Sequence, residues 1–258
     1  MTARRLAVLL LLAFYAACLV FAPAGALPAH AALLPPSLAH PLGTDELGRD
    51  MLLALLQAGR SSLLVAGVTT AVALVLGLGA GVGAAIGPPL LDEVLMRLAE
   101  IVASLPVLLL AVLVAALFGG SAWNLALLLG LTRWPLLARI LRAETQALLA
   151  REYLRAAWAL GATPGHVALR HLVPNLAAPL LAGAGIVFGG AVLAEAALAF
   201  VGLGDPDAGS WGRMVAQGFA VMGLGWWVWL WPAAMLVLVS GLVAVAAAPP
   251  EQPASTPR

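Results

Sequence analysis

The sequence predicts an all-α, polytopic membrane protein with about six transmembrane helices. Its 258 residues are 63% hydrophobic and 10% charged, with a mean hydropathy of +1.03, whereas soluble domains are about half apolar and about a quarter charged. A bilayer core requires roughly 20 apolar residues per helix. Five stretches meet or approach this length, namely 6–22, 62–87, 98–118, 178–201 and 227–248. A sixth, 121–142, is interrupted by Arg133 and Pro135.

The composition also excludes several functions. A net charge of +1 argues against a nucleic-acid partner, because such proteins carry a basic patch. The single cysteine, Cys18, excludes an internal disulfide and a cysteine metal cage, and we expect no metal site. The chain lacks a GxxxxGK[ST] phosphate loop. It therefore cannot hydrolyse ATP itself.

The first apolar segment has two interpretations. Arg4, Arg5, the apolar run and the small residues AGALPAHA (24–31) are also typical of a cleaved signal peptide. However, the run continues through Cys18 to Phe21, and cleavage would leave five spans with the termini on opposite faces. We therefore expect a retained first helix.

The arginine distribution predicts the orientation of the chain in the membrane. With the N-terminus inside, the cytoplasmic segments hold nine arginines and the outer segments hold Arg49, Arg60 and Arg213. Cytoplasmic loops carry the excess of basic residues. Six spans place both termini on the same side, so the N-terminus and the C-terminus are both expected in the cytoplasm.

Residues 143–177 then form a cytoplasmic loop of helix–turn–helix character. Gly161 is expected to stop a helix in a left-handed conformation, and Thr163 followed by Pro164 is typical of a new helix N-terminus. Pro174 and Asn175 are expected to end this second helix. It would expose apolar residues, among them Ala162, Val167 and Leu169, which suits a docking surface for a soluble partner.

A second polar stretch, HPLGTDELGRD (40–50), precedes the span at 62–87. Gly43 and Gly48 predict turns, and Thr44 could cap a short helix with Asp45 in its first turn. The alternative is a surface loop held by Asp–Arg pairs.

Several polar, proline and glycine residues lie within the predicted spans. Glu195 is expensive to place in a membrane; it could line a translocation path, hold a neighbouring loop, or cap a helix break. Arg133 could face a central cavity or extend to the headgroups. Pro106 is expected to bend the span at 98–118. A stripe of small residues from Gly77 to Gly83 predicts close helix packing, within this chain or against a second subunit.

These motifs together resemble permease subunits of dipeptide/oligopeptide/nickel-type ABC importers. Ala156-Ala157, Gly161 and Val173-Pro174 are similar to the EAA loop of this family, and HPLGTDxLGRD to its extracytoplasmic motif. LAEAALAFVGLG (193–204) and SWGRMVAQG (210–218), read as a span and the loop after it, follow in the family's order. The resemblance covers roughly residues 1–240 and implies the type I ABC-importer permease fold.

The resemblance also implies site residues. The ATPase-coupling loop would comprise Glu152, Arg155, Ala156, Ala157, Gly161, Ala162, Thr163, Pro164, Gly165, His166 and Pro174. The extracytoplasmic motif would comprise Gly43, Thr44, Asp45, Gly48, Arg49 and Asp50. Glu195 and Arg133 are candidates for the translocation path.

The resemblance implies that the chain is a subunit of a bacterial inner-membrane importer that works by alternating access. It would carry peptides, nickel chelates or other small solutes. Its partners would be a second homologous permease, two cytoplasmic ATPases, an extracytoplasmic binding protein and the lipid bilayer. ATP and Mg²⁺ would be used by the ATPases, with no cofactor on this chain. The rival functions are a secondary transporter or a channel without an ATPase, and an intramembrane enzyme, for which no HExxH or GxSxG motif occurs.

The predicted organisation has three parts: 1–61 with the first helix and the outer motif, a permease core at 62–248, and a disordered cytoplasmic tail at 249–258. Three features depart from the family. Arg155 replaces the glutamate of the EAA loop, the DPDAG loop (205–209) is short, and the tail lacks the usual amphipathic helix.

Overall fold

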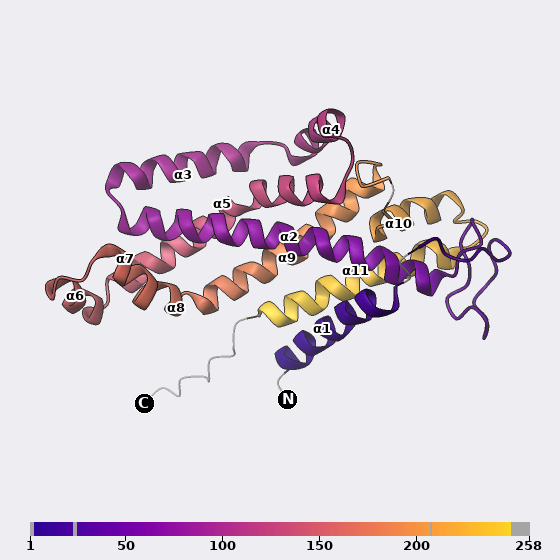
Figure 1. Cartoon of the computed structure of the whole chain (residues 1–258), viewed down its shortest axis with the longest axis horizontal. Coiled ribbons are helices and arrows are strands. Elements are labelled where there is room, and N and C mark those ends of the chain that lie inside the picture. The colour runs from indigo at the N-terminus through magenta and orange to yellow at the C-terminus, as the bar shows by residue number, and fades with distance from the viewer. Residues whose placement is uncertain (1–2, 23–24, 207, 249–258) are drawn as a thin grey trace.

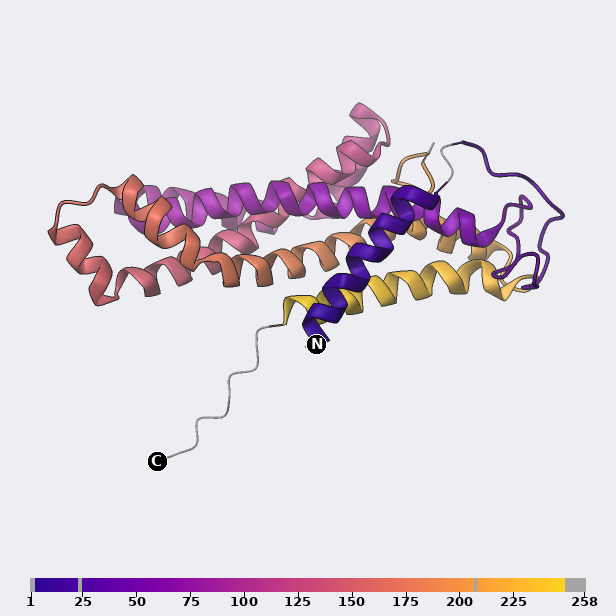
Figure 2. The same cartoon turned by 60° about the horizontal axis from the view of Figure 1, so that its bottom comes forward.

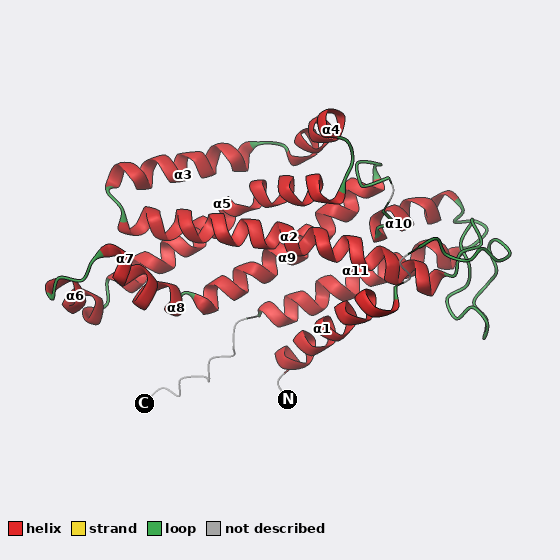
Figure 3. Cartoon of the chain, viewed as in Figure 1, coloured by secondary structure: helices red, strands yellow, loops and turns green. Residues whose placement is uncertain are grey.

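The computed structural model of the chain describes residues 3–22, 25–206 and 208–248. Every regular element among these residues is a helix, and the strand-like pairings recorded for them are two isolated β-bridges (Figure 3). The predicted all-α class is therefore confirmed. The predicted tail at 249–258 lies outside the described residues.

Four long helices form the body of the molecule and run side by side (Figure 1). They are α2 (Met51–Ile86), α5 (Ala122–Leu149), α9 (Ala177–Phe200) and α11 (Trp226–Ala247). All four are long and apolar enough to cross a membrane. They correspond to four of the six predicted spans, and α5 continues through Pro135 without a break.

The predicted span at 98–118 is present as a broken pair of helices. α3 (Pro89–Ser104) and α4 (Val107–Phe118) meet at a bend of 80°, and counting the pair as one span raises the number of candidate spans to five. The bend lies at Leu105-Pro106, because the proline ring obstructs the helix and Pro106 has no N–H to donate. The expected bend at Pro106 is confirmed.

The remaining predicted span is α1 (Ala3–Phe21), whose apolar stretch Arg5–Phe21 is shorter than the four long helices. It packs against α11 and α2, and its Cys18 is fully buried in the same core as Trp211 and Met51. The start of α1 and the end of α11 lie next to each other in both views (Figures 1 and 2).

The most extensive packing is between α2 and α5, where glycines remove the side chains that would keep the helices apart. A Cβ at Gly77 would lie 2.5 Å from the Cβ of Leu137, and a Cβ at Gly81 would lie 2.7 Å from the carbonyl oxygen of Ala138. Gly77 and Gly81 of the small-residue stripe thus serve packing within this chain, one of the two predicted alternatives, whereas Gly79 has no neighbouring atom within 4 Å of the position of a Cβ.

The two ends of this bundle differ in structure. At one, the motif end, residues 25–50 lie beside α10 (Trp211–Ala220). At the other, the hairpin end, α5 is followed by α6 (Glu152–Ala159), α7 (Pro164–Val167), the π-helical turn η1 (Ala168–Leu172) and α8 (Val173–Asn175). Figure 1 shows the two ends at opposite extremes of the long axis.

Candidate functional site

The motif end is organised around Thr44, whose exposed fraction is 0%. Its hydroxyl donates to the carbonyl of Ala31 at 2.8 Å and accepts the N–H of Leu34 at 2.8 Å. Its carbonyl accepts the indole N–H of Trp227, on α11, at 3.0 Å. Thr44 therefore connects its own segment to residues 31–34 and to α11.

The expectation that Thr44 caps a short helix is wrong. Residues 44–50 form turns closed by an antiparallel bridge between Thr44 and Asp50. Gly43 and Gly48 have φ values of +81° and +74°, in the left-handed region that an α-helix cannot include. A Cβ at Gly48 would also lie 2.2 Å from the carbonyl oxygen of His30, so the backbone conformation and the close approach both require glycine there.

Asp45 and Arg49 form the ion pair that the alternative interpretation of this stretch anticipated. Arg49 Nε donates to Asp45 Oδ2 at 2.6 Å, while Asp45 Oδ1 accepts the N–H groups of Leu47 and Arg49 at 2.9 and 2.8 Å. Asp45 is 4% exposed. The carboxylate is thus fully used in holding the turn closed.

Asp50 joins the motif to the first turn of α2. Its Oδ1 accepts the N–H groups of Leu52 and Leu53 at 2.9 and 3.3 Å, as an N-cap does. Its Oδ2 contacts His40 Nδ1 at 2.9 Å. Asp50 therefore positions the motif on α2, as Thr44 does on α11.

Glu195 lies at the junction of three helices near the motif end and is 2% exposed. The Ser62 hydroxyl of α2 donates to Glu195 Oε2 at 3.0 Å and accepts the N–H of Trp211 at 3.2 Å. The side chain of Ser210, the N-cap of α10, interacts with the same carboxylate. The carboxylate is therefore enclosed between α2, α9 and α10, where it holds the start of α10.

α10 is a helix where the sequence predicted a loop. It packs tightly on α9, since a Cβ at Gly212 would lie 2.2 Å from the carbonyl oxygen of Ala196. Sequence reasoning also missed Ser62, the partner of Glu195. Ser210 is a residue type typical of a helix N-cap, and this local signal could have located the helix start. In the structure its hydroxyl accepts the N–H of Arg213, three residues later.

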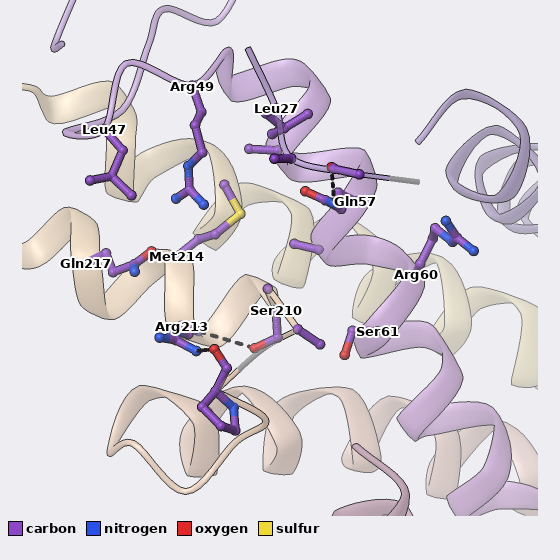
Figure 4. A pocket seen from close by; sticks show the side chains of 17 residues that line it. Leu27, Leu47, Arg49, Gln57, Arg60, Ser61, Ser210, Arg213, Met214 and Gln217 are labelled. Carbon is purple, nitrogen blue, oxygen red and sulfur yellow. Dashed lines mark hydrogen bonds between the residues drawn. The ribbon is translucent and has the colours of Figure 1, made fainter. Parts of the chain in front are cut away.

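A cavity of about 680 Å³ opens at the motif end between the first turns of α2, the segment 25–27 and α10 (Figure 4). Arg49, Arg60 and Arg213, the three arginines predicted to lie outside, all line it. Figure 4 shows Arg49 and Arg213 on one side and Arg60 on the opposite rim. Arg213 Nη1 also donates to the carbonyls of Asp205 and Pro206 at 3.1 and 2.5 Å, which fixes the loop before α10.

At the hairpin end, the predicted turn chemistry is confirmed. Gly161 has a φ of +84°, Thr163 accepts the N–H of His166 at 3.4 Å as the N-cap of α7, and Pro164 occupies the first helical position. Gly161 has no neighbouring atom within 4 Å of the position of a Cβ. Unlike Gly48, it is therefore required for its conformation alone.

The hairpin is anchored to the bundle by one apolar face. Leu154, Val167, Leu172 and Leu176 are fully buried and belong to the same core as Leu137 and Leu141 of α5. The expectation that Val167 is exposed is wrong, because the hairpin turns this side chain toward α5. Ala162 is partly buried, whereas Leu169 is 75% exposed and Leu160 is 89% exposed.

The second helix of the hairpin ends at Asn175, in line with the expected end at Pro174 and Asn175. The N–H of Val173 bonds to the carbonyl of Ala168, five residues back, so the helix widens into a π turn directly before the proline. Pro174 then occupies the start of α8, where its missing N–H is tolerated. Asn175 Nδ2 donates to the carbonyl of His171 at 2.7 Å.

Several of the remaining residues of the predicted coupling loop are exposed. Arg155, which replaces the glutamate of the family, donates from Nη2 to the carbonyl of Ala150 at 3.0 Å and so caps the end of α5. Glu152 is exposed at the start of α6. The carbonyl of Ala157 accepts the N–H of Ala162 at 3.1 Å. Gly165 and His166 are exposed, and the side chain of Ala156 is outside the description.

Arg133 lies within the long helix α5 and is partly exposed. Its Nε is buried and has no hydrogen-bond partner, and the described residues provide no ion pair for its guanidinium. Among the described residues, no group of His, Cys, Asp or Glu side chains could hold a metal ion.

The fold is that of an ABC-importer permease. The structure of an inward-facing MetNI methionine ABC transporter contains a chain that this structure matches with a TM-score of 0.63 over 76% of this chain and 94% of that one, at 22% sequence identity. A second crystal form of MetNI matches with a TM-score of 0.64. The predicted fold class is thereby confirmed, with a span count of four to five plus the shorter α1.

The chain belongs to the family of binding-protein-dependent transport system inner membrane components. The sequence model of this family matches residues 73–248. A putative peptide permease of Brucella suis is 36% identical over 206 residues, which are 79% of this chain and 68% of the relative. A probable D,D-dipeptide transport system permease of Escherichia coli is 36% identical over 214 residues, 81% of this chain and 71% of the relative. A di/tripeptide transport system permease of Pseudomonas aeruginosa is 34% identical over 198 residues, 76% of this chain and 65% of the relative.

The chain is therefore a transport permease subunit of the inner membrane and not an enzyme. The family resemblance inferred from the EAA-like loop and the HPLGTDELGRD stretch is confirmed.

Proposed function

We propose that this chain forms part of the path by which an ABC importer carries small peptides across the bacterial inner membrane, and that the hairpin end docks on its ATPases. The observation that carries the proposal is the contrast within the hairpin. Four buried apolar side chains attach it to α5, while Leu160 and Leu169 stay exposed. Exposed leucines on an ordered helical surface are typical of a protein interface.

The hairpin is connected tightly enough to transmit force to the membrane helices. Two residues, Ala150 and Arg151, separate α5 from α6, and Leu176 alone separates α8 from α9. Both junctions are held, by the Arg155 cap on Ala150 and by the burial of Leu176. A displacement of the hairpin by a closing ATPase would therefore move α5 and α9 together, and these helices are expected to open the path alternately to each side.

The proposed orientation places the hairpin end in the cytoplasm and the motif end outside. The arginine distribution supports this orientation, and both α1 and α11 have their terminal ends directed away from the motif end (Figure 1). The N-terminus and C-terminus would then both be cytoplasmic. The rigid motif end would face the extracytoplasmic binding protein.

The remaining parts of the importer would be supplied by other chains. These are a second homologous permease, two ATPases that use ATP and Mg²⁺, and the binding protein. Peptides are the substrate class that the names of the relatives support. The alternative is a transporter or channel that needs no ATPase.

Substitution of both exposed leucines, Leu160→Ser with Leu169→Ser, tests the proposal. In the importer purified from its native membranes, the variant is expected to fold normally but to lose most of the bound ATPase, because the docking surface becomes polar. Leu38→Ser, an equally exposed leucine at the motif end, is the matched control and should retain it. If the double variant keeps its full complement of ATPase, or the wild-type chain purifies without one, the docking assignment is overturned.

A further inference from the structure

Arg133 carries a charge without an ion-pair partner among the described residues, about midway along the membrane-spanning part of α5. It lies eleven residues after Ala122, the first residue of α5, or about 16 Å along the helix axis. The hydrocarbon core of a bilayer is about 30 Å thick, so the Cα of Arg133 is near its middle. An ionisable group at this depth normally faces a partner or a water-filled path rather than lipid.

The side chain does not extend along α5 to the membrane surface. It crosses to α9, where a Cβ at Gly190 would lie 3.9 Å from Arg133 Nη1. Gly190 is itself ten residues before Phe200, the last residue of α9, or about 15 Å from that end. The guanidinium therefore stays at mid-membrane depth, which argues against the interpretation that Arg133 reaches the headgroups.

The guanidinium lies on a face of the chain that is open. On α9, Ile186 and Leu193, which flank Gly190 on one helical face, are 56% and 51% exposed. On α5, Leu136, about one turn after Arg133, is also exposed. Gly190 adds no side chain beside the charge. The guanidinium therefore borders an exposed face of the chain rather than its packed core.

Nothing within the described part of the chain neutralises this charge. Glu195, on the same helix as Gly190, has its carboxylate engaged by Ser62 and Ser210. The recorded ion pairs involve other arginines. The Nε–H of Arg133 is buried without an acceptor. The planar fork of an arginine is suited to a carboxylate, which accepts two parallel N–H bonds.

We infer that Arg133 binds the carboxylate of the transported peptide, and that the α5–α9 face bearing it lines the translocation path. This inference rests on the proposed function, because every unmodified peptide carries a carboxylate at one end. Arg60 and Arg213, which line the cavity at the motif end, have the same sign of charge as Arg133, so both places would favour an anionic group.

The test uses the complete importer, with its binding protein, in proteoliposomes. Radiolabelled dialanine and dialanine with an amidated C-terminus are supplied at concentrations that saturate the binding protein, so their uptake rates report the membrane step. The wild-type importer is expected to carry dialanine about tenfold faster than the amide, the usual size of one charge-assisted contact. Arg133→Gln should lower dialanine uptake to the rate of the amide and leave the amide unchanged.

Two further variants separate recognition from structure. Arg133→Lys keeps the positive charge but lacks the two parallel N–H donors of the guanidinium. It should therefore recover part of the preference for dialanine over its amide. Arg139→Gln is the matched control, because Arg139 is exposed six residues further along α5 and makes no recorded bond with a described residue; it should behave as wild type.

Two results with Arg133→Gln would overturn the inference. One is an unchanged preference for dialanine. The other is loss of the second permease from the purified complex, which would identify an acidic side chain of that subunit as the partner. A wild-type importer that takes up no dialanine would instead refute the peptide substrate, and the inference with it.

Discussion

The motif end and the hairpin end are built on opposite principles, although both were recognised by short polar motifs. At the motif end, Thr44, Asp45 and Asp50 each make two or more hydrogen bonds, several of them to residues far away in the sequence. At the hairpin end, the polar contacts of Thr163, Arg155 and Asn175 are local, spanning three to five residues. The attachment of the hairpin to the bundle is apolar.

This difference separates a fixed element from one suited to move. Buried hydrogen bonds fix a position closely, because each lost bond leaves an unsatisfied group. An apolar contact is less directional and allows a helix to shift over its neighbour. The π turn at Ala168–Leu172 is consistent with a functional element, since such turns are frequent at functional sites. The motif end is tied to α2 and α11 by hydrogen bonds, whereas the apolar attachment of the hairpin end suits the docking role that we propose for it.

The largest expected contrast is between two glycines with the same left-handed conformation. Gly48→Ala should destabilise the folded protein by about 3 kcal/mol or more, because a left-handed alanine costs about 1–2 kcal/mol and its Cβ would also collide with the backbone of His30. Gly161→Ala meets no neighbouring atom and should cost about 1 kcal/mol. Thermal unfolding in detergent measures both effects. Equal decreases in the unfolding temperature of the two variants would contradict the difference that we describe between the motif end and the hairpin end.

The next contrast is between two acidic residues. Asp45→Asn should lower the free energy of unfolding by about 2 kcal/mol, because an enclosed carboxylate loses its charge and its ion pair with partly exposed Arg49. Glu152→Gln, on the exposed face of α6, should leave stability unchanged. Chemical unfolding of the two purified variants gives the comparison, and a stable Asp45→Asn protein would show that the turn does not depend on this pair.

Glu195 distinguishes a structural carboxylate from one on the path. Glu195→Ala should destabilise by about 2 kcal/mol, since Ser62 and Ser210 lose a buried partner. Glu195→Gln keeps an acceptor oxygen and should cost less than about 1 kcal/mol, with peptide uptake close to wild type. A large loss of uptake by a stable Glu195→Gln protein would instead assign the carboxylate to transport.

The smallest effect is expected at the cap of α7. Thr163→Ala removes one exposed bond of 3.4 Å and should cost about 0.5 kcal/mol. The global unfolding midpoint should fall by no more than about 2 °C. Amide exchange over residues 164–172 should become faster, because the start of the helix frays. An unchanged exchange rate would mean that apolar anchoring alone fixes this helix.

The sequence predicted what depends on local chemistry. Long apolar stretches identified the four long helices, and the order Gly161, Thr163, Pro164 located the turn of the hairpin, because conformation and capping are decided by neighbouring residues. Thr44 was misassigned for the opposite reason. Its partners Ala31, Leu34 and Trp227 are distant in the sequence, and no local pattern reveals them.

Other errors have similar physical origins. The burial of Val167 depends on the direction in which the hairpin folds onto α5. α10, at ten residues, is too short to register as a span and was read as a loop. The partners of Glu195 are on α2 and at the start of α10, so the distinction between an enclosed carboxylate and an open one required the packed structure. The open position of Arg133 equally followed from the placement of α9.

The most direct test of the two-end account is a pair of crosslinks in native membranes. Cys18 is fully buried, so the wild-type chain serves as the unlabelled control for a water-soluble thiol reagent. Thr163→Cys at the hairpin end is expected to crosslink to an ABC ATPase, identified by mass spectrometry, and Leu38→Cys at the motif end is not. An ATPase attached at position 38, or a well-labelled Thr163→Cys protein with no ATPase attached, would contradict the assignment of the hairpin as the coupling element.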